Sequence, residues 1–105
     1  MIHNINNGLK IFKDDYGHVF RIYAYLDISA ATSIKMKVQK PSGTTVTWTS
    51  SLASDNKYYA TYTTIDGDIN ESGVYLLSLE LVFASSSLKQ ESIEFNVEEQ
   101  FYDLP

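Results

Sequence analysis

A chain of 105 residues has the usual size of one domain, so the sequence predicts a single domain. It contains no cysteine, which excludes a disulfide framework, a cysteine-based metal site and a thiol nucleophile, and which suits folding in a reducing cytoplasm. The net charge of −5 argues against a nucleic-acid partner, and without a signal peptide or an apolar run near ~20 residues we expect neither secretion nor a membrane partner.

Apolar and polar residues alternate with period two along most of the chain, which predicts strands rather than helices. A short first strand is expected at residues 9–12, and a turn then leads to a second strand at residues 19–26. The next strand, residues 34–40, ends at the turn Pro41-Ser42-Gly43-Thr44 and returns as residues 45–49. Proline presets its own φ and glycine adds flexibility two residues later, so these two strands are predicted to form a hairpin.

The second half of the chain continues the pattern. Residues 50–56 and 84–87 are expected as loops, and strands are expected at residues 57–63, 74–83 and 91–97. About seven strands at this spacing predict an all-β fold, an immunoglobulin-like two-sheet antiparallel β-sandwich. The side chains predicted to form one core are Phe20, Ile22, Met36, Val38, Trp48, Leu77, Leu79, Ile93 and Phe95.

The domain is assigned to residues 1–97, and residues 98–105 form a C-terminal tail outside the strand pattern. The tail carries Phe101, Tyr102 and Leu104 among acidic residues. Such apolar anchors suit an arm that orders against a neighbouring subunit, and these three residues are the candidate subunit contact. The alternative is that the tail folds back over its own sandwich.

An acidic loop that begins at Asp66 ends in Ser-Gly-x-Tyr, directly before a long apolar strand. This is the sequence form of a tyrosine corner, in which a tyrosine near the start of a late strand bonds back to upstream backbone. Tyr75 is therefore expected to be buried, with its hydroxyl bonded to the backbone of residues 66–70. Gly73 is expected to matter for the same turn.

Asp66, Asp68 and Asn70 stand at alternate positions, as at the start of a calcium-binding loop. The pattern then fails, because Glu71 stands where the sharp turn needs glycine and Leu77 where a bidentate glutamate is needed. We therefore expect a solvated loop stabilised by Asx turns, and no metal.

His18 lies near Asp14 and Asp15, which together could be drawn as a base with an orienting carboxylate. No Ser or Cys nucleophile stands in a motif that needs them, and His3 and His18 lack the spacing of a zinc site. The sequence therefore predicts no catalytic residue, no cofactor-binding residue and no enzyme activity.

Tyr23 and Tyr25 share the outward face of the second strand, and Tyr59 lies on a later strand. These three residues are the candidate glycan contact, because exposed tyrosine rings stack on sugar rings or on another protein. The alternative is that they are ordinary cross-strand pairs that stabilise a sheet.

An ordered set of short motifs runs from about residue 9 to residue 97. It comprises Lys40-Pro41-Ser42-Gly43-Thr44, Val46-Thr47-Trp48, Tyr62-Thr63, Gly67-Asp68-Ile69, Glu71-Ser72-Gly73-Val74-Tyr75 and Glu91-Ser92-Ile93-Glu94-Phe95-Asn96-Val97. By their order and spacing, the chain resembles the small immunoglobulin-like proteins and domains encoded among the structural genes of tailed bacteriophages, which include the N-terminal domains of some upper baseplate proteins. The resemblance implies a non-enzymatic virion protein that is assembled in the host cytoplasm. Trp48 lies on the fourth predicted strand rather than the third, so an antibody-type core is not expected.

Two functions stay open. The first is a structural subunit of the baseplate, tail or capsid, which binds other virion proteins in a homo- or hetero-oligomer through strand edges, loops or the tail. The second is an adhesion module whose loops or tyrosines recognise a bacterial surface glycan. A contiguous exposed aromatic patch would favour the second function.

Overall fold

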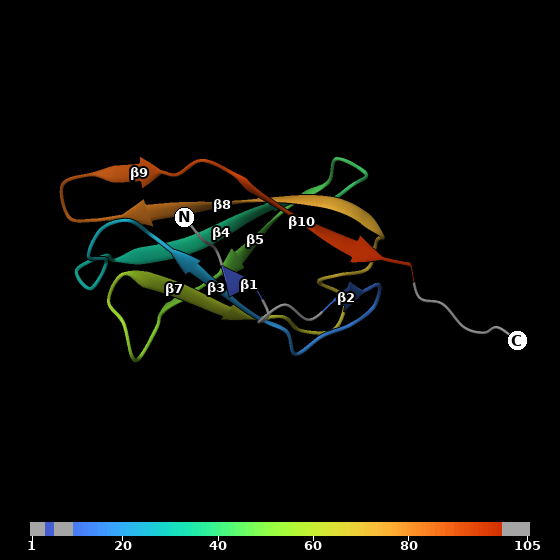
Figure 1. Ribbon diagram of the computed structural model, residues 1–105. Helices are drawn as coiled ribbons and strands as arrows, with labels where there is room; N and C mark the ends of the chain where they lie inside the picture. Colours follow the sequence, from blue (N-terminus) through green and yellow to red (C-terminus); the bar gives the residue numbers. More distant parts are fainter. Residues whose placement is uncertain (1–3, 6–9, 100–105) are drawn as a thin grey trace, which may run out of the picture.

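The computed structural model describes residues 4–5 and 10–99, and it contains two β-sheets that face each other (Figure 1). The smaller sheet has the order β1-β3-β7-β6, with β1 at Asn4–Ile5, β3 at Val19–Tyr23, β7 at Tyr59–Thr63 and β6 at Ser51–Leu52. The larger sheet has the order β2-β10-β8-β4-β5, with β2 at Ile11–Phe12, β10 at Ile93–Glu98, β8 at Gly73–Val82, β4 at Ser33–Gln39, β5 at Thr45–Thr49, and β9 at Ser87–Lys89 beside β8. No helix occurs in the described residues, so none of them forms a helical membrane span.

The strand order is that of an immunoglobulin-like sandwich. In that fold one sheet contains strands A, B, E and D, and the other contains G, F, C and C′. Here β1, β3, β7 and β6 take the first set of places, and β10, β8, β4 and β5 take the second. All strand pairs are antiparallel except β2 with β10. The predicted all-β sandwich is confirmed.

The described residues contain ten strands rather than the predicted seven. The additional strands β1, β6 and β9 have only two or three residues, which is too short for an alternating pattern to stand out. β6 lies in the predicted loop at residues 50–56, and the predicted loop at residues 84–87 leads directly into β9. β3 also ends at Tyr23 rather than at residue 26, because Tyr25 has a φ of 66°, which an extended strand cannot contain.

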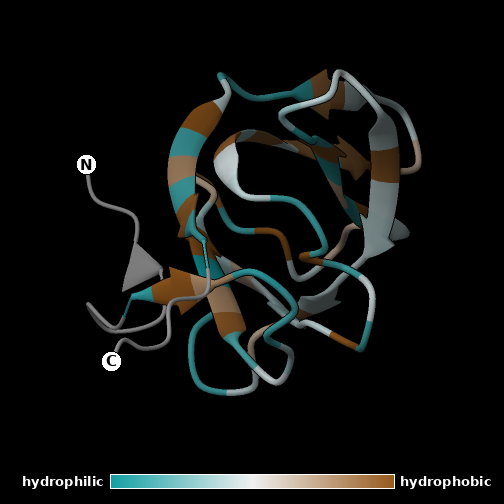
Figure 2. Cartoon of the chain, turned by 90° about the vertical axis from the view of Figure 1, so that its right-hand side faces the viewer, coloured by the Kyte–Doolittle hydropathy of each residue, from teal (hydrophilic) through white to brown (hydrophobic). Residues whose placement is uncertain are grey.

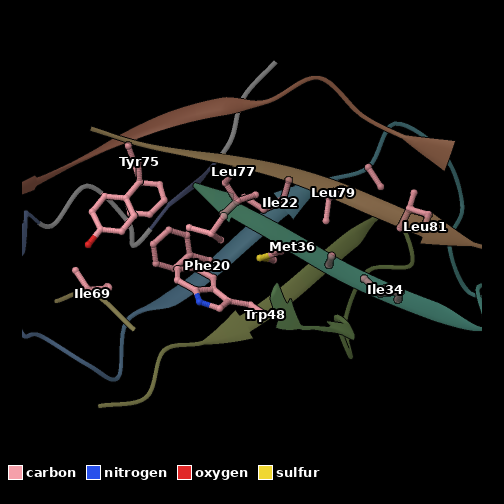
Figure 3. Close-up of a cluster of buried hydrophobic side chains, with 14 of the residues drawn as sticks. Phe20, Ile22, Ile34, Met36, Trp48, Ile69, Tyr75, Leu77, Leu79 and Leu81 are labelled. Carbon is pink, nitrogen blue, oxygen red and sulfur yellow. The ribbon is translucent and has the colours of Figure 1, made fainter. Parts of the chain in front are cut away.

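The core lies between the sheets, where alternating residues of the two inner faces meet. Figure 2 shows this alternation as hydrophobic and hydrophilic bands along the strands. Phe20 lies near the centre, with its ring centroid 5.3 Å from that of Trp48 and 4.8 Å from that of Phe95 (Figure 3). Eight of the nine predicted core residues are buried, and the ninth, Ile93, is partly buried against them. Ile28 and Ile69 join the core from connecting segments, which the strand pattern did not predict.

The start of the predicted tail belongs to the sandwich. β10 continues to Glu98, one residue beyond the predicted domain end, and the Glu98 carbonyl accepts a hydrogen bond from the Lys13 amide at 2.9 Å. Glu99 forms a 3.8 Å ion pair with Lys13. The three candidate contact residues of the tail, Phe101, Tyr102 and Leu104, lie outside the described residues, as does His3.

Candidate functional site

The three candidate tyrosines lie together at one end of the smaller sheet. Tyr23 faces Tyr59 across the β3–β7 pair, and their ring centroids are 5.3 Å apart. Tyr25 packs edge-on against Tyr23 at 4.5 Å. The guanidinium of Arg21 covers the Tyr59 ring at 4.4 Å and is paired with the Asp55 carboxylate. The tyrosines are thus one contiguous cluster, in which Tyr25 is 55% exposed and the other two are half-buried.

A groove of about 370 Å³ opens beside this cluster, and we call it the tyrosine groove. Its lining residues are Ile22, Tyr23, Tyr25, Leu77, Leu79, Gln90, Glu91 and Ile93. The groove lies where β8 passes from one partner to the next, because β10 pairs with its first half and β9 with its last three residues. Its apolar floor, aromatic wall and carboxylate are the features of a small-ligand site, in which apolar contacts supply affinity and a few polar groups set orientation.

Gln90 holds one wall of the tyrosine groove in place. Its side-chain amide donates to the Ala24 carbonyl at 2.7 Å, which ties the β9–β10 connection to the segment after β3. The backbone carbonyl of Gln90 accepts a hydrogen bond from the Ser78 hydroxyl at 2.7 Å, and its backbone amide donates to the Leu79 carbonyl at 3.0 Å. The sequence did not predict this role, because a single glutamine in a polar stretch carries no pattern. Tyr25 also lines the groove, and its φ of 66° is a left-handed backbone conformation, which costs a non-glycine residue energy.

Tyr75 forms the corner near the start of β8. Its side chain is fully buried, its hydroxyl donates to the Glu71 carbonyl at 2.7 Å, and the Glu71 amide donates back to the hydroxyl at 3.0 Å. The acceptor therefore lies one residue beyond the predicted range of 66–70. Burial is the main cause that raises the pKa of the Tyr75 hydroxyl above its usual value, so it remains a neutral donor near pH 7.

The corner is joined to the β4–β5 hairpin. Gly73 has a φ of 123°, and a Cβ at this position would lie 3.0 Å from the Pro41 side chain. The Glu71 carboxylate accepts hydrogen bonds from both the amide and the hydroxyl of Ser42, each at 2.9 Å. Two turns that are distant in sequence are therefore fixed to each other, and glycine at residue 73 is required by its backbone conformation and by the close contact.

In the acidic loop, residues 66–70, the side-chain oxygens of Asp68 and Asn70 accept hydrogen bonds from protein donors. The Asp68 carboxylate accepts from the Tyr62 hydroxyl at 2.7 Å and from the Ile65 amide at 2.9 Å. The Asn70 carbonyl oxygen accepts from the buried Lys40 ammonium at 2.7 Å, a positive charge that would repel a cation. Among the residues that the structure describes, no three histidine or acidic side chains converge as metal ligands.

His18 and Asp15 do meet, with 2.7 Å between the ring Nε2 and a carboxylate oxygen. The same carboxylate oxygen accepts from the Phe12 amide at 2.9 Å. Partial burial opposes ionisation of Asp15, but these hydrogen bonds outweigh it and lower the pKa of the carboxyl. The described side-chain hydrogen bonds of this pair stay within its own turn, and the His18 backbone bonds to Thr64, so the arrangement is that of a structural clasp between β2 and β3.

β5 forms one edge of the larger sheet. The Lys40 amide donates to the Thr44 carbonyl, and the Ser50 amide donates to the Ile34 carbonyl. In residues 44–50 the backbone groups of the even-numbered residues are therefore hydrogen-bonded to the β4 strand and its ends. In an antiparallel pair the intervening residues direct both backbone groups the other way. The amides and carbonyls of Thr45, Thr47 and Thr49 therefore point away from the sheet, and the described residues provide no backbone partner for them.

Comparisons with protein-family models, with curated proteins and with solved structures gave no match.

Proposed function

We propose that this chain is a non-enzymatic structural protein of a tailed-bacteriophage virion, a baseplate, tail or capsid accessory subunit that acts through protein–protein contacts. Two observations support the virion assignment. One is the resemblance carried by the order of the motifs between residues 9 and 97, and the other is a cysteine-free sequence that suits assembly in the host cytoplasm. The proposal includes no cofactor, no metal, no nucleic acid and no membrane.

The observation that carries the contact role is the open edge of β5. Edge strands expose unpaired backbone groups to other chains, and proteins usually protect them with charged residues, proline, bulges or short length. β5 has five residues, the sequence Thr-Val-Thr-Trp-Thr, and therefore neither charge nor proline. It is the longest of the edge strands that the structure describes, since β1, β2, β6 and β9 have two or three residues. Such an edge suits a surface that another protein covers.

The test is the composition of the particle. Quantitative mass spectrometry of phage particles, purified by two independent density steps, should detect the chain at a fixed ratio to the major tail or capsid protein. A parallel sample from the host lysate serves as the control for carry-over. Absence from the particles, or a ratio that changes between purifications, would contradict the proposal.

The second candidate function is glycan recognition on the host surface by the same virion protein. The observation that favours it is the contiguity of Tyr23, Tyr25 and Tyr59 beside the tyrosine groove, with the Glu91 carboxylate as a polar group for sugar hydroxyls. Isolated protein should then bind host cells or purified surface polysaccharide, and Tyr25→Ala should reduce this binding while Tyr16→Ala, at an exposed tyrosine that does not line the groove, should not. Equal binding by both variants, or no binding by the wild type, would exclude this function.

A further inference from the structure

We propose that the β5 edge binds the β5 edge of a second copy of this chain, so that two larger sheets join into one across a two-fold axis at Thr47. The inference rests on the proposed function, because it names the partner of the open edge. Its test is nevertheless separate, since self-association is measured in solution and particle composition is not involved.

The backbone supports one antiparallel register. With Thr47 facing Thr47 of the partner copy and Thr45 facing Thr49, every outward amide and carbonyl of both edges finds a partner. A shift by one residue would place outward groups opposite inward ones, and a shift by two would leave one end of each edge unpaired. The outward amides and carbonyls of residues 45, 47 and 49 are therefore all hydrogen-bonded only when the two-fold axis passes through Thr47.

The side chains suit the same register. Thr45, Thr47 and Thr49 are all exposed, and in the pairing they would form threonine–threonine contacts, which stabilise neighbouring strands. On the inner side, the half-buried Val46 would lie opposite Trp48 of the other copy, and Val46 would lose part of its exposed apolar surface, whereas Trp48 is already buried in its own core. Because the outward sequence is threonine at all three positions, it reads the same in both directions, as a two-fold interface requires.

Charge does not oppose the pairing at this edge. β5 has no charged residue, and the nearest cations, Lys35 and Lys37, lie on β4. The two Lys37 backbones would be three strand spacings apart, about 14 Å, and each ammonium bonds its own Thr47 hydroxyl at an exposed site, where salt screens the two charges. A second copy is therefore acceptable at this edge even though each chain carries a net charge of −5.

The first experiment is sedimentation velocity of the full chain, 11.9 kDa as a monomer, at concentrations up to about 1 mM, because an interface below ~1,200 Å² binds weakly. The wild type should reach twice the monomer mass as concentration rises. Thr47→Glu should weaken the association by at least about tenfold, since the two introduced carboxylates would face each other across the axis. Within its own sheet the new carboxylate faces Lys37, whose ammonium already donates to the Thr47 hydroxyl at 2.9 Å, so the variant should stay folded.

The matched control is Thr61→Glu. Thr61 also faces a cation across a strand pair, Arg21, but it lies on β7, which has β3 on one side and β6 on the other. This variant should associate as the wild type does.

The second experiment uses the absence of native cysteine. Thr47→Cys should form an intermolecular disulfide under mild oxidation, since facing residues of a hydrogen-bonded antiparallel pair have Cα atoms about 5.5 Å apart, within disulfide range. Thr49→Cys is equally exposed on the same edge, but in this register its thiol faces Thr45, so it should cross-link much more slowly. Three results would overturn the proposal: a wild type that remains monomeric throughout, a Thr47→Glu variant that associates like the wild type, or equal cross-linking by the two cysteine variants.

Discussion

The hydroxyl of Tyr75 should contribute measurably to stability, and Tyr75→Phe isolates its contribution. The substitution removes one oxygen and keeps the ring, which is fully buried and stacked against Phe95 with 4.9 Å between centroids. The lost hydroxyl donates to the Glu71 carbonyl and accepts from the Glu71 amide. Each hydrogen bond contributes about 0.5–1.5 kcal/mol net, so the free energy of unfolding should fall by about 2 kcal/mol.

Urea unfolding, followed by the fluorescence of the buried Trp48, measures this loss. The midpoint should fall while the slope stays unchanged, because the surface exposed on unfolding is the same. For a domain near 100 residues a loss of this size should also lower the melting temperature by roughly 10 °C. Tyr16→Phe is the control, since Tyr16 is 65% exposed and surface substitutions usually change stability by less than about 0.5 kcal/mol. A Tyr75→Phe variant as stable as this control would refute the corner as a source of stability.

Gly73→Ala should lower the melting temperature more than Gly17→Ala does. Both positions have a positive φ, but only at residue 73 would the new Cβ lie 3.0 Å from the Pro41 side chain. Equal decreases in melting temperature would contradict this prediction. Burial first, and the Asp68 carboxylate second, raise the pKa of the Tyr62 hydroxyl. Because the pKa of Tyr62 in the folded protein lies above the unfolded value of ~10, its contribution to stability is complete below about pH 10 and is lost as the pH rises further. The free energy of unfolding of the wild type should therefore decline above about pH 10, and Tyr62→Phe should make this decline less steep. Equal slopes for wild type and variant would contradict the assignment. Calcium at roughly millimolar concentration should leave the melting temperature unchanged, and a rise of several degrees would show that the acidic loop binds the ion after all.

The sequence was most informative where a local pattern decides the structure. The hairpin of β4 and β5 follows from strict alternation and the Pro-Ser-Gly-Thr turn, and its strand ends differ from the prediction by one residue at most. The corner at Tyr75 also follows from a local motif. Its acceptor was misplaced by one residue, because the bond depends on how the chain turns at Gly73, which the φ of 123° fixes only in the folded protein.

Features that depend on distant segments were not predictable. Lysine is rarely buried, yet Lys40 is buried directly after β4, where its ammonium donates to the Asn70 side chain of the acidic loop. The tyrosine groove likewise depends on Gln90 reaching across to Ala24. Whether a strand lies at an edge is decided by the pairing of the whole sheet, so the open side of β5 could not be read from its residues.

The most direct test of the β5 edge as the contact surface is backbone amide exchange of the wild type, followed residue by residue by NMR at low and at high concentration. The amides of Val46 and Trp48 bond to β4 and should exchange slowly at both concentrations. The amides of Thr45, Thr47 and Thr49 should exchange quickly in dilute solution and become protected as the concentration approaches about 1 mM, because a contact limited to a five-residue edge strand is small and therefore weak. Fast exchange of these three amides at every concentration would contradict the account.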